Sequence, residues 1–580
     1  MPACELIGFT LGHMYYTTTN RYVSIRYSAV LNSDSISLLI VTFMIARLRK
    51  ILEKTFILPF RGHYKEVMMM QKKENGVSRR DVIKGAAAGA GILAFGQLGA
   101  GISRAAQPPQ KWDKETDVVV IGYGAAGAAS AIAAKEAGAN VLIIDKASVP
   151  GGASQLSGGI IYAADTAIQK QQGVEDSADA MIKYFEAANR GLMDKEILRT
   201  MADNSADVIN WLMELGMKEY QLQIAGAEDM PEFERVTPAV KRAHVIKGLG
   251  RKMMEKLRKA VSDRNIEENM RVEAKELISD PVRNIMGVLA TGRDKKDIAI
   301  KAHRGVIICA GGYSFNKELV RSFAAMFTDA VPVGDPHSTG DGMIIGAGEG
   351  AALTCFGGPE LAVGLPGLVY GPGRSRHIRA LFLYANPVVF VDQTGNRFAN
   401  ESSYYAHLTP MVAAQRNASI IFDNEVYRKV EWPSYIVGSS PELKEELASG
   451  VIKKADTIKG LATMLDIDPN SLEVTLNAYN EAAKNGKDPQ FGKTKALGPV
   501  NAPPFYGGSI GATMLQCYGG LKINNKAQVI DVFGNVIPRL YAAGAVTGTV
   551  YTYPGSGTLL NTCFVFGRLA GKLAAEEKTI

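Results

Sequence analysis

Two glycine-containing motifs have the residue types and spacing that ligand chemistry requires. The first reads GYGAAG over residues 122–127, between the apolar run Asp117–Ile121 and an alanine-rich stretch. A strand, a GxGxxG turn and a helix together favour dinucleotide binding, because the glycines bring backbone N–H groups to a pyrophosphate. Asp145 ends a second apolar run about 20 residues on, where a ribose-binding carboxylate belongs.

The second motif is a Tyr-Pro-Gly-Ser-Gly turn, residues 553–557, which leads into an apolar, helix-like stretch. A tyrosine hydroxyl and the unpaired N–H groups at a helix start are donors that can bind a ligand oxygen. A tight structural turn that happens to carry an aromatic residue is the alternative interpretation.

Further glycine-rich segments follow strand-like runs and favour FAD over NAD. Residues 150–159 read PGGASQLSGG soon after Asp145, where a nicotinamide domain would normally continue with another βα unit. Glycines permit long backbone contact with a flavin, and later strand–glycine units at 306–312 and 540–544 predict one FAD domain built from distant segments. The predicted cofactor-binding residues are Gly122, Gly124, Ala125, Ala126, Gly127, Asp145, Lys146, Gly151, Gly152, Ala153, Ser154, Ser157, Gly158, Gly159, Gly311, Gly312, Asp341, Gly544, Leu559 and Leu560.

Length and composition indicate a globular protein of two or three domains. The chain has 580 residues, 60 of them glycine, and 21% charged residues. Its formal net charge of +7 is modest, so nucleic-acid binding is not expected. Five scattered cysteines form no CxxC pair, which argues against zinc, iron–sulfur and covalent haem sites, and no metal site is predicted.

The first hundred residues have the pattern of a targeting segment. An Arg79-Arg80 pair precedes a weakly apolar, glycine- and alanine-rich run, and residues 70–105 resemble a twin-arginine (Tat) export signal. Residues 1–69 show no domain pattern and are interpreted as a non-native or unstructured leader. We therefore expect a mature chain that begins near Ala106 and lies in the periplasm or at the outer face of the cell membrane.

The motifs resemble the FAD-dependent superfamily of fumarate reductases and 3-ketosteroid dehydrogenases, and most closely the 3-ketosteroid dehydrogenase branch. The likeness extends from about Asp117 to Leu573. The motifs that carry it are GGASQLSGG, CAGGYSFN, STGDGM at 338–343, GNRFANES at 395–402, NAPPFYGG at 501–508, YGGLKI at 518–523 and YAAG.

This resemblance implies an α/β fold, a Rossmann-like FAD-binding domain with an inserted α+β capping (catalytic) domain. By this likeness the FAD-binding domain comprises residues 111–359 and 507–580, and the cap comprises residues 360–506. A substrate between cap and flavin would exchange a hydride with flavin N5, while a cap side chain moves the matching proton. The implied reaction changes a C–C bond next to a carbonyl or carboxylate.

Polar positions around the implied substrate favour the ketosteroid branch. Fumarate reductases place a proton-donating arginine five residues after the Asn of RFxNE, where this chain has Tyr405. Their substrate-clamping arginine has no counterpart in residues 547–560, and residues 516–518 lack their histidine. The ketosteroid dehydrogenases have tyrosines instead, so the likeness implies that Tyr405 moves the proton, while the Tyr553 hydroxyl and the Gly557 N–H bind the ketone oxygen.

Several alternatives stay open at this point. Tyr404 could replace Tyr405 in the mechanism, and Tyr553 could be a structural residue. Dehydrogenases that act at C1–C2 carry a further tyrosine, for which residues 215–236 offer only Tyr220, so Delta-1 and Delta-4 chemistry are both considered. Reduction of another unsaturated acid, fumarate-, urocanate- or acrylate-like, is the alternative function, and a non-catalytic flavoprotein is a third.

The expected partners follow from export and from the implied site. An exported flavoenzyme lacks access to nicotinamide, so its electrons should come from an external carrier: a quinone, a cytochrome or another flavoprotein. That arrangement favours reduction of an apolar ketone or enone at its C=C bond. The Lys/Glu-rich ranges 178–218 and 441–485 are predicted to be helices with solvated faces.

Overall fold

A computed structural model describes residues 108–224, 239–364, 386–403, 405–415, 417–429, 441–551 and 554–580. Within these ranges it gives only the backbone for Pro359–Gly364, Tyr405, Ala406 and Pro441. The described residues all belong to one compact unit, Ala86–Ile580. The predicted leader, the predicted export signal, Tyr404 and Tyr553 lie outside the described residues.

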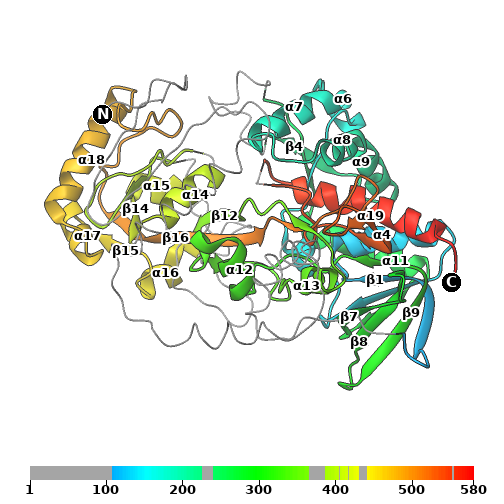
Figure 1. Cartoon of the computed structure of the whole chain (residues 1–580). Coiled ribbons are helices and arrows are strands. Elements are labelled where there is room, and N and C mark those ends of the chain that lie inside the picture. Colours follow the sequence, from blue (N-terminus) through cyan, green and yellow to red (C-terminus); the bar gives the residue numbers. More distant parts are fainter. Residues whose placement is uncertain are drawn as a thin grey trace, which may run out of the picture. The chain divides into compact units, whose positions relative to one another are not determined.

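Eight of the described strands form the larger sheet (Figure 1). Its order is β18-β19-β9-β1-β2-β6, and the neighbours from β19 to β6 run parallel, while β8 and β7 continue antiparallel from β9. Val118, Val119 and Val120 of β1 are fully buried, because both faces of this sheet are covered. The bounds are β1 Lys114–Ile121, β2 Val141–Asp145, β6 Glu267–Met270, β7 Glu273–Ser279, β8 Ile285–Thr291, β9 Asp297–Ile308, β18 Gln528–Ile530 and β19 Val536–Ala542.

Two helices from opposite ends of the described chain pack against each other beside this sheet. In Figure 1 the red helix α19 lies next to α4. Gly571 of α19 meets Ser130 of α4 so closely that a Cβ on Gly571 would lie 2.1 Å from the Ser130 carbonyl oxygen, and Gly567 similarly faces Ala126. The bounds are α4 Ala125–Glu136, α11 Leu249–Asp263, α12 Lys317–Phe323, η2 Ala325–Phe327, α13 Asp341–Gly348 and α19 Thr558–Glu576.

A small antiparallel sheet has the order β3-β5-β4, and the four helices α6 to α9 lie between β3 and β4 in the sequence. The predicted helical range 178–218 contains three helices, because Ser177, Asp194 and the Asn204 turn each begin a new one. The bounds are α5 Gly152–Leu156, β3 Ile160–Tyr162, α6 Ala167–Gln171, α7 Ala178–Ala188, α8 Lys195–Asp203, α9 Ser205–Glu214, β4 Tyr220–Gln223 and β5 Ala243–Ile246.

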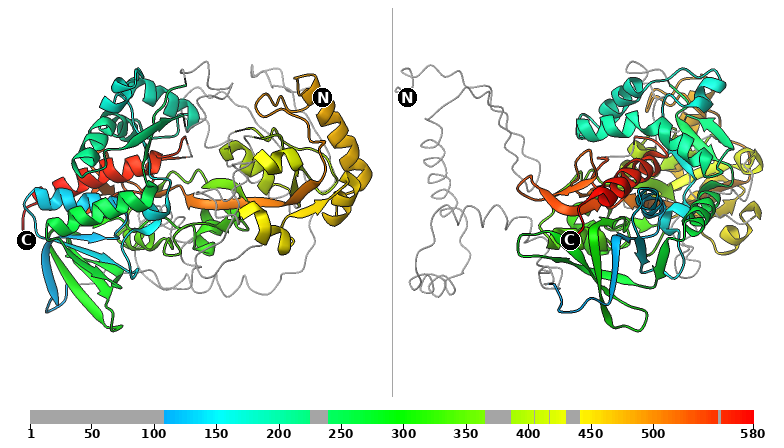
Figure 2. Two further views of the ribbon diagram at one scale, coloured as in Figure 1. Left: turned by 180° about the vertical axis from the view of Figure 1, so that it is seen from behind. Right: turned by 90° about the vertical axis from the view of Figure 1, so that its right-hand side faces the viewer.

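The second sheet is organised around the long strand β16, Phe505–Cys517, drawn in orange in Figure 2. Its first half pairs with β14 and β15, and its second half pairs with β12 and β10. The predicted domain boundary between residues 506 and 507 falls inside this strand, and the division into domains stays a prediction. The other strands are β10 Val331–Pro332, β12 Pro359–Gly364, β13 Val389–Val391, β14 Ala418–Asp423 and β15 Lys453–Ala455, and a separate pair is β11 Leu353–Thr354 with β17 Gly520–Leu521.

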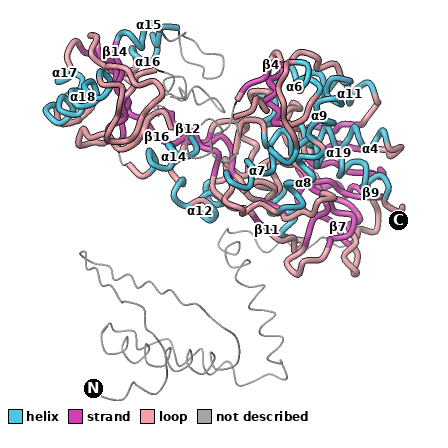
Figure 3. The backbone as a smooth tube through the Cα atoms, turned by 90° about the horizontal axis from the view of Figure 1, so that it is seen from above, coloured by secondary structure: helices cyan, strands magenta, loops and turns pink. Residues whose placement is uncertain are grey.

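Alternate residues of β13 and β14 serve two separate apolar cores. Phe390 and Ile420 belong to one cluster, while Val389, Val391 and Ile421 belong to the other. This period of two places a buried layer on each face of the sheet. Figure 3 shows α15, α16, α17 and α18 near β14. The bounds of the helices in this part of the chain are α14 Tyr405–Ala413, α15 Asn424–Lys429, η4 Pro441–Leu443, α16 Lys444–Ala448, α17 Ile458–Met464 and α18 Pro469–Lys484.

Two further findings bear on the predictions. The range 441–485 contains η4, α16, α17 and α18 as predicted, but also the strand β15, which pairs with β16. Across the described ranges, no helix is both long and apolar enough to cross a membrane.

Candidate cofactor and substrate site

The turn between β1 and α4 is closed so tightly that two of its glycines admit no side chain. Gly122 has a φ of +105°, and a Cβ there would lie 2.3 Å from the Cys309 carbonyl oxygen. A Cβ on Gly127 would lie 1.9 Å from the Gly122 carbonyl oxygen. Gly124 precedes α4 and provides no side-chain cap, so the Ala126 and Gly127 N–H groups of the first turn can donate to an anion.

Asp145 is fixed at the end of β2 by two backbone donors. Its Oδ2 accepts a hydrogen bond from Tyr123 N–H, and its Oδ1 accepts one from Ala147 N–H, both at 2.7 Å. Burial raises the pKa of Asp145, although the same two N–H groups act to lower it. Each carboxylate oxygen keeps a second lone pair that can accept a hydrogen bond from a ribose hydroxyl.

The second glycine-rich segment folds back onto the first turn of α4. Gly151 N–H donates to the Tyr123 carbonyl at 2.9 Å, and Ala125 N–H donates to Ser154 Oγ at 3.0 Å. Ser157 Oγ donates to the Ser154 carbonyl at 2.7 Å, so this hydroxyl supports the loop itself. The segment also contains Gly152 and Ala153 in α5, and Gly158 and Gly159 before β3.

Lys146 and Asp341, which were predicted as separate cofactor residues, form one cluster. Lys146 Nζ donates to Asp341 Oδ2 and to Thr339 Oγ1, each at 2.5 Å, and Thr339 Oγ1 donates to Asp341 Oδ1 at 2.8 Å. The cluster ties the residue after β2 to the start of α13. Thr339 was not predicted as a site residue, although it lies within the STGDGM motif at 338–343, because the motif alone does not show which of its side chains Lys146 contacts.

Three predicted segments meet at the carboxyl edge of the parallel strands. Ile121 pairs with Ile308, and Ile308 pairs with Ala542, so the ends of β1, β9 and β19 are in register. Ligands bind at such an edge in open α/β sheets. The glycines that follow β9 and β19 are Gly311 with φ +76°, Gly312, and Gly544 with φ +83°, and Gly544 lies against Ala126 and Cys563.

The start of α19 is in direct contact with β3. Gly557 has a φ of +99°, and a Cβ there would lie 2.7 Å from the Ile160 carbonyl oxygen. The Gly557 carbonyl accepts hydrogen bonds from Tyr162 N–H at 3.2 Å and Asn561 N–H at 2.9 Å. Gly557 is followed by the first turn of α19, which contains Leu559 and Leu560.

In the capping segment, a buried cluster of charges stands just before α14. Arg397 Nε and Nη2 donate to the two carboxylate oxygens of Glu401, each at 2.9 Å, and Nη2 also donates to Asp488 Oδ2 at 3.0 Å. Lys493 Nζ lies 3.2 Å from Glu401 Oε2 and donates to the Val388 carbonyl at 2.8 Å. Arg397 and Glu401 therefore hold the loop before α14 together.

Burial acts in opposite directions on the pKa values of Lys493 and Asp488. Burial lowers the pKa of Lys493, although the Glu401 carboxylate opposes that shift. For Asp488, burial acts to raise the pKa, but hydrogen bonds and the charge of Arg397 outweigh it and hold the pKa below its ordinary value. The cluster leads directly to α14, whose first residue is Tyr405.

Tyr220, the only tyrosine of the range 215–236, lies in β4. Its ring meets the buried His244 edge-on, with 6.2 Å between the ring centroids. His244 in turn contacts Thr166 Oγ1 at 2.8 Å. Tyr220 therefore packs within the small sheet.

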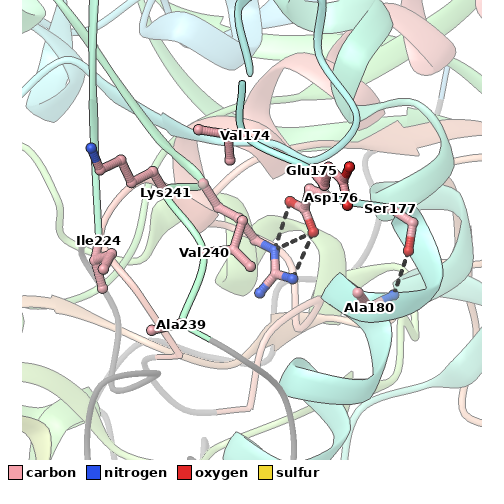
Figure 4. A pocket seen from close by; sticks show the side chains of 10 residues that line it. Val174, Glu175, Asp176, Ser177, Ala180, Ile224, Ala239, Val240 and Lys241 are labelled. Atoms are coloured by element: carbon pink, nitrogen blue, oxygen red, sulfur yellow. Dashed lines mark hydrogen bonds and ion pairs between the residues drawn. The ribbon is translucent and has the colours of Figure 1, made fainter. Parts of the chain in front are cut away.

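A cavity of about 660 Å³ lies beside the small sheet (Figure 4). One wall is the buried ion pair of Arg242 and Asp176, in which Arg242 Nη2 lies 2.7 Å from Asp176 Oδ1. None of the predicted cofactor-binding residues lines it. The lining residues are Val174, Glu175, Asp176, Ser177, Ala180, Ile224, Ala239, Val240, Lys241 and Arg242.

The residues at the strand edge fit FAD. The GYGAAG turn admits no side chain at Gly122 or Gly127, and it leads into the N-terminus of α4, whose backbone N–H groups can bind an anion. Asp145 has a fixed carboxylate for a ribose, and the glycines after β9 and β19 leave room for a long ligand. These residues would hold the pyrophosphate and the adenosine ribose. The individual cofactor contacts stay predictions.

Alanine at position 127 is expected to weaken FAD binding about tenfold or more, because inserting a methyl group into a closed site costs about 1–3 kcal/mol. FAD affinity of the refolded apoprotein, followed by flavin fluorescence, measures the effect. Gly173→Ala is the control, since a Cβ there meets nothing within 4 Å although φ is +68°. Equal FAD affinity in Gly127→Ala and the unchanged protein would contradict the expectation.

The comparison with protein families identifies the FAD binding domain family, which matches residues 117–560. Sequence relatives include a probable fumarate reductase of Shewanella frigidimarina, 29% identical over 80% of this chain and 75% of the relative. The acrylate reductase flavoprotein subunit of Shewanella woodyi is 30% identical over 86% of this chain and 98% of that protein. The digoxin reductase of Eggerthella lenta is 28% identical over 87% and 97%.

Solved structures agree with this assignment. The open conformation of a flavocytochrome c3 fumarate reductase superposes with a TM-score of 0.67 at 27% identity, covering 87% of this chain and 82% of that one. A 3-ketosteroid-delta4-(5alpha)-dehydrogenase from Rhodococcus jostii shares the fold, with a TM-score of 0.67 at 24% identity over 81% and 99%. The predicted fold class, FAD-binding with a cap, is thus confirmed. The chain belongs to the FAD binding domain family and is an FAD-dependent oxidoreductase of the fumarate reductase type that acts on carbon–carbon bonds.

Proposed function

We propose that the protein transfers hydrogen to or from a C–C bond next to a ketone, with a 3-ketosteroid or a similar apolar enone as its substrate. The observation that carries the proposal is the lack of positive charge between β19 and α19. Residues 547–560 contain no arginine, lysine or histidine. A dicarboxylate needs cationic, preferably bidentate partners, whereas a ketone needs only neutral donors.

The packing of this segment supports a neutral ligand. Val546, Thr547, Thr549 and Val550 are all buried. The Thr547 hydroxyl donates to the Gly544 carbonyl at 2.7 Å, so it is engaged within the segment. Four of the five residues 546–550 are therefore buried, and the Thr547 hydroxyl is internally paired, which supports a substrate with a single polar end.

In the proposed site each residue has a distinct task. Tyr405 moves the proton at carbon, while the Tyr553 hydroxyl and the Gly557 N–H bind the ketone oxygen. Enone reduction and ketone desaturation both develop negative charge on that oxygen, and two neutral donors stabilise it. FAD, when bound, supplies or accepts the hydride. Both the Delta-4 and the Delta-1 bond of a 3-ketosteroid meet these requirements.

Reduction of another unsaturated acid is the second candidate function. It is favoured by the names of two sequence relatives, a probable fumarate reductase and an acrylate reductase flavoprotein subunit. A third relative is named for digoxin, so the relatives do not share one acceptor. For this chain the lack of cationic residues in 547–560 weighs against the acids.

Anaerobic reoxidation of the reduced flavin tests the proposal. The protein is reduced with a limiting amount of dithionite and mixed with a 4-ene-3-ketosteroid, fumarate, acrylate or urocanate, while the oxidised flavin absorbance is followed. The 4-ene-3-ketosteroid should reoxidise the flavin at least tenfold faster than any acid, since one lost charge-assisted contact costs about 1.5–3 kcal/mol.

A saturated 3-ketosteroid is the matched control for that measurement, because it binds similarly but has no C=C bond to accept hydrogen. Reoxidation by fumarate as fast as by the enone would overturn the choice of substrate. Reoxidation by none of the acceptors would instead favour a non-catalytic flavoprotein.

The electron partner and the location of the protein are part of the same proposal. One relative is named a fumarate reductase (cytochrome), which supports an external carrier for this chain as well. We assign that role to a quinone, a cytochrome or another flavoprotein, and we propose that the protein lies, after Tat export, in the periplasm or at the outer face of the cell membrane. With such a carrier as donor, C=C reduction is the favoured direction.

A further inference from the structure

Two segments that are distant in the sequence form hydrogen bonds with the turn before α19. The Tyr184 hydroxyl of α7 donates to the Pro554 carbonyl at 2.5 Å. At the other end of the turn, Tyr162 N–H of β3 donates to the Gly557 carbonyl at 3.2 Å. Pro554 directly follows Tyr553, so one of these contacts is adjacent to the residue proposed to bind the ketone oxygen.

Packing fixes the direction of the Tyr184 hydroxyl. Tyr184, Tyr162 and Phe185 are fully buried. The rings of Tyr162 and Tyr184 stack with 6.4 Å between centroids, and Phe185 meets both edge-on at 5.4 and 5.9 Å. A ring that is packed on several sides in a dense core keeps one orientation, so its hydroxyl stays directed at the Pro554 carbonyl.

The turn itself depends on such external contacts. Pro554 is buried and has no N–H, and its carbonyl needs a donor from elsewhere in the protein. The Gly555 carbonyl is bound locally, by the Thr558 hydroxyl at 2.8 Å. Because a trans peptide is planar, a donor on the Pro554 carbonyl also fixes the direction of the Gly555 N–H.

We propose that Tyr184 is a positioning residue, whose hydroxyl holds the turn 553–557 in the orientation that carbonyl binding requires. This inference rests on the proposed function of the turn and deepens it. It assigns a role to α7, a helix that supplies none of the predicted cofactor or catalytic residues. Tyr184 acts through Pro554 and does not itself contact the substrate.

Tyr184→Phe tests the role, because phenylalanine keeps the packed ring and removes only the hydroxyl. The variant should bind FAD normally, while its KM for the enone rises about 3- to 10-fold, the effect of losing one buried hydrogen bond. The expected split is a raised KM with a smaller change in kcat. The perturbation of the oxidised flavin spectrum by bound enone should need correspondingly more ligand.

Two further variants separate the hydroxyl from general stability. Tyr427→Phe removes a hydroxyl that donates to the Glu442 carbonyl at 2.9 Å in the cap, and it should leave KM unchanged. Phe185→Leu loosens the packing that orients the hydroxyl without removing it, so it should raise KM less than Tyr184→Phe does. An unchanged KM in Tyr184→Phe overturns the proposal, and so does an equal KM change in Tyr427→Phe at equal thermal stability.

These measurements also distinguish failure of the positioning role from failure of the proposed function. If the unchanged protein reduces enones and Tyr184→Phe behaves like Tyr427→Phe, only the positioning role fails. If none of the ketones reoxidises the reduced flavin of the unchanged protein, the proposed function is wrong, and the positioning role is wrong with it.

Discussion

Phenylalanine in place of Tyr405 is expected to lower enone turnover about 100- to 10,000-fold, the usual effect of removing a general acid or base. The ring is kept, but no proton can be exchanged with the substrate carbon. A phenol with an ordinary pKa of about 10 still carries its proton at neutral pH and can donate it. The variant should remain yellow, because none of the predicted FAD-binding residues lies in α14. Rapid mixing of the reduced variant with a 4-ene-3-ketosteroid measures the loss.

Tyr404→Phe is the matched control for this experiment, since it makes the same change at the neighbouring position. It should retain most of the turnover. A full rate in Tyr405→Phe would remove Tyr405 from the mechanism. Loss of turnover confined to Tyr404→Phe would transfer the role to Tyr404.

Replacing Glu401 with glutamine should destabilise the cap by about 3–5 kcal/mol, the cost of removing one partner from a buried ion pair. Two buried cations, Arg397 and Lys493, face two buried carboxylates, Glu401 and Asp488. Glutamine keeps the shape but leaves an excess of positive charge in the interior. Since the cluster stands just before α14, turnover should fall as well, because Tyr405 loses its support. Thermal unfolding and enone kinetics measure the two effects.

The double variant E401Q/K493M tests whether charge balance is the cause. It leaves Arg397 paired with Asp488 alone, so it should be more stable than the single variant. Glu425→Gln is the control, because its pair with Lys429 is exposed and should contribute less than about 1 kcal/mol. A double variant no more stable than E401Q would refute the explanation by charge.

The glycine-rich cofactor turn could be predicted from sequence because its causes are local. Gly127 must be glycine since its own neighbour Gly122 lies against it, and both are within one short motif. The likeness to a family then supplied the cap and the order of the segments. Whether Tyr405, Tyr553 and Gly557 act as expected stays a prediction.

Hydrogen bonds that support the site from a distance could not be predicted from the sequence, even where one partner, Ser154, was predicted as a cofactor-binding residue. Ser154 accepts from Ala125 N–H, and Tyr184 donates to Pro554, across long separations in the chain. Such contacts involve single polar side chains without periodicity or a motif. The short strand β15 was missed for a related reason, because Lys453–Ala455 becomes a strand only by pairing with β16.

The contact of α19 with α4 has a consequence for how the protein is made. The ribosome releases α4 about 400 residues before the neighbouring strand β19 and the partner helix α19. The edge at which β1, β9 and β19 end together is therefore incomplete until β19 has been synthesised. We expect FAD to be captured only after α19 has left the ribosome, and a chain lacking α19 to remain colourless.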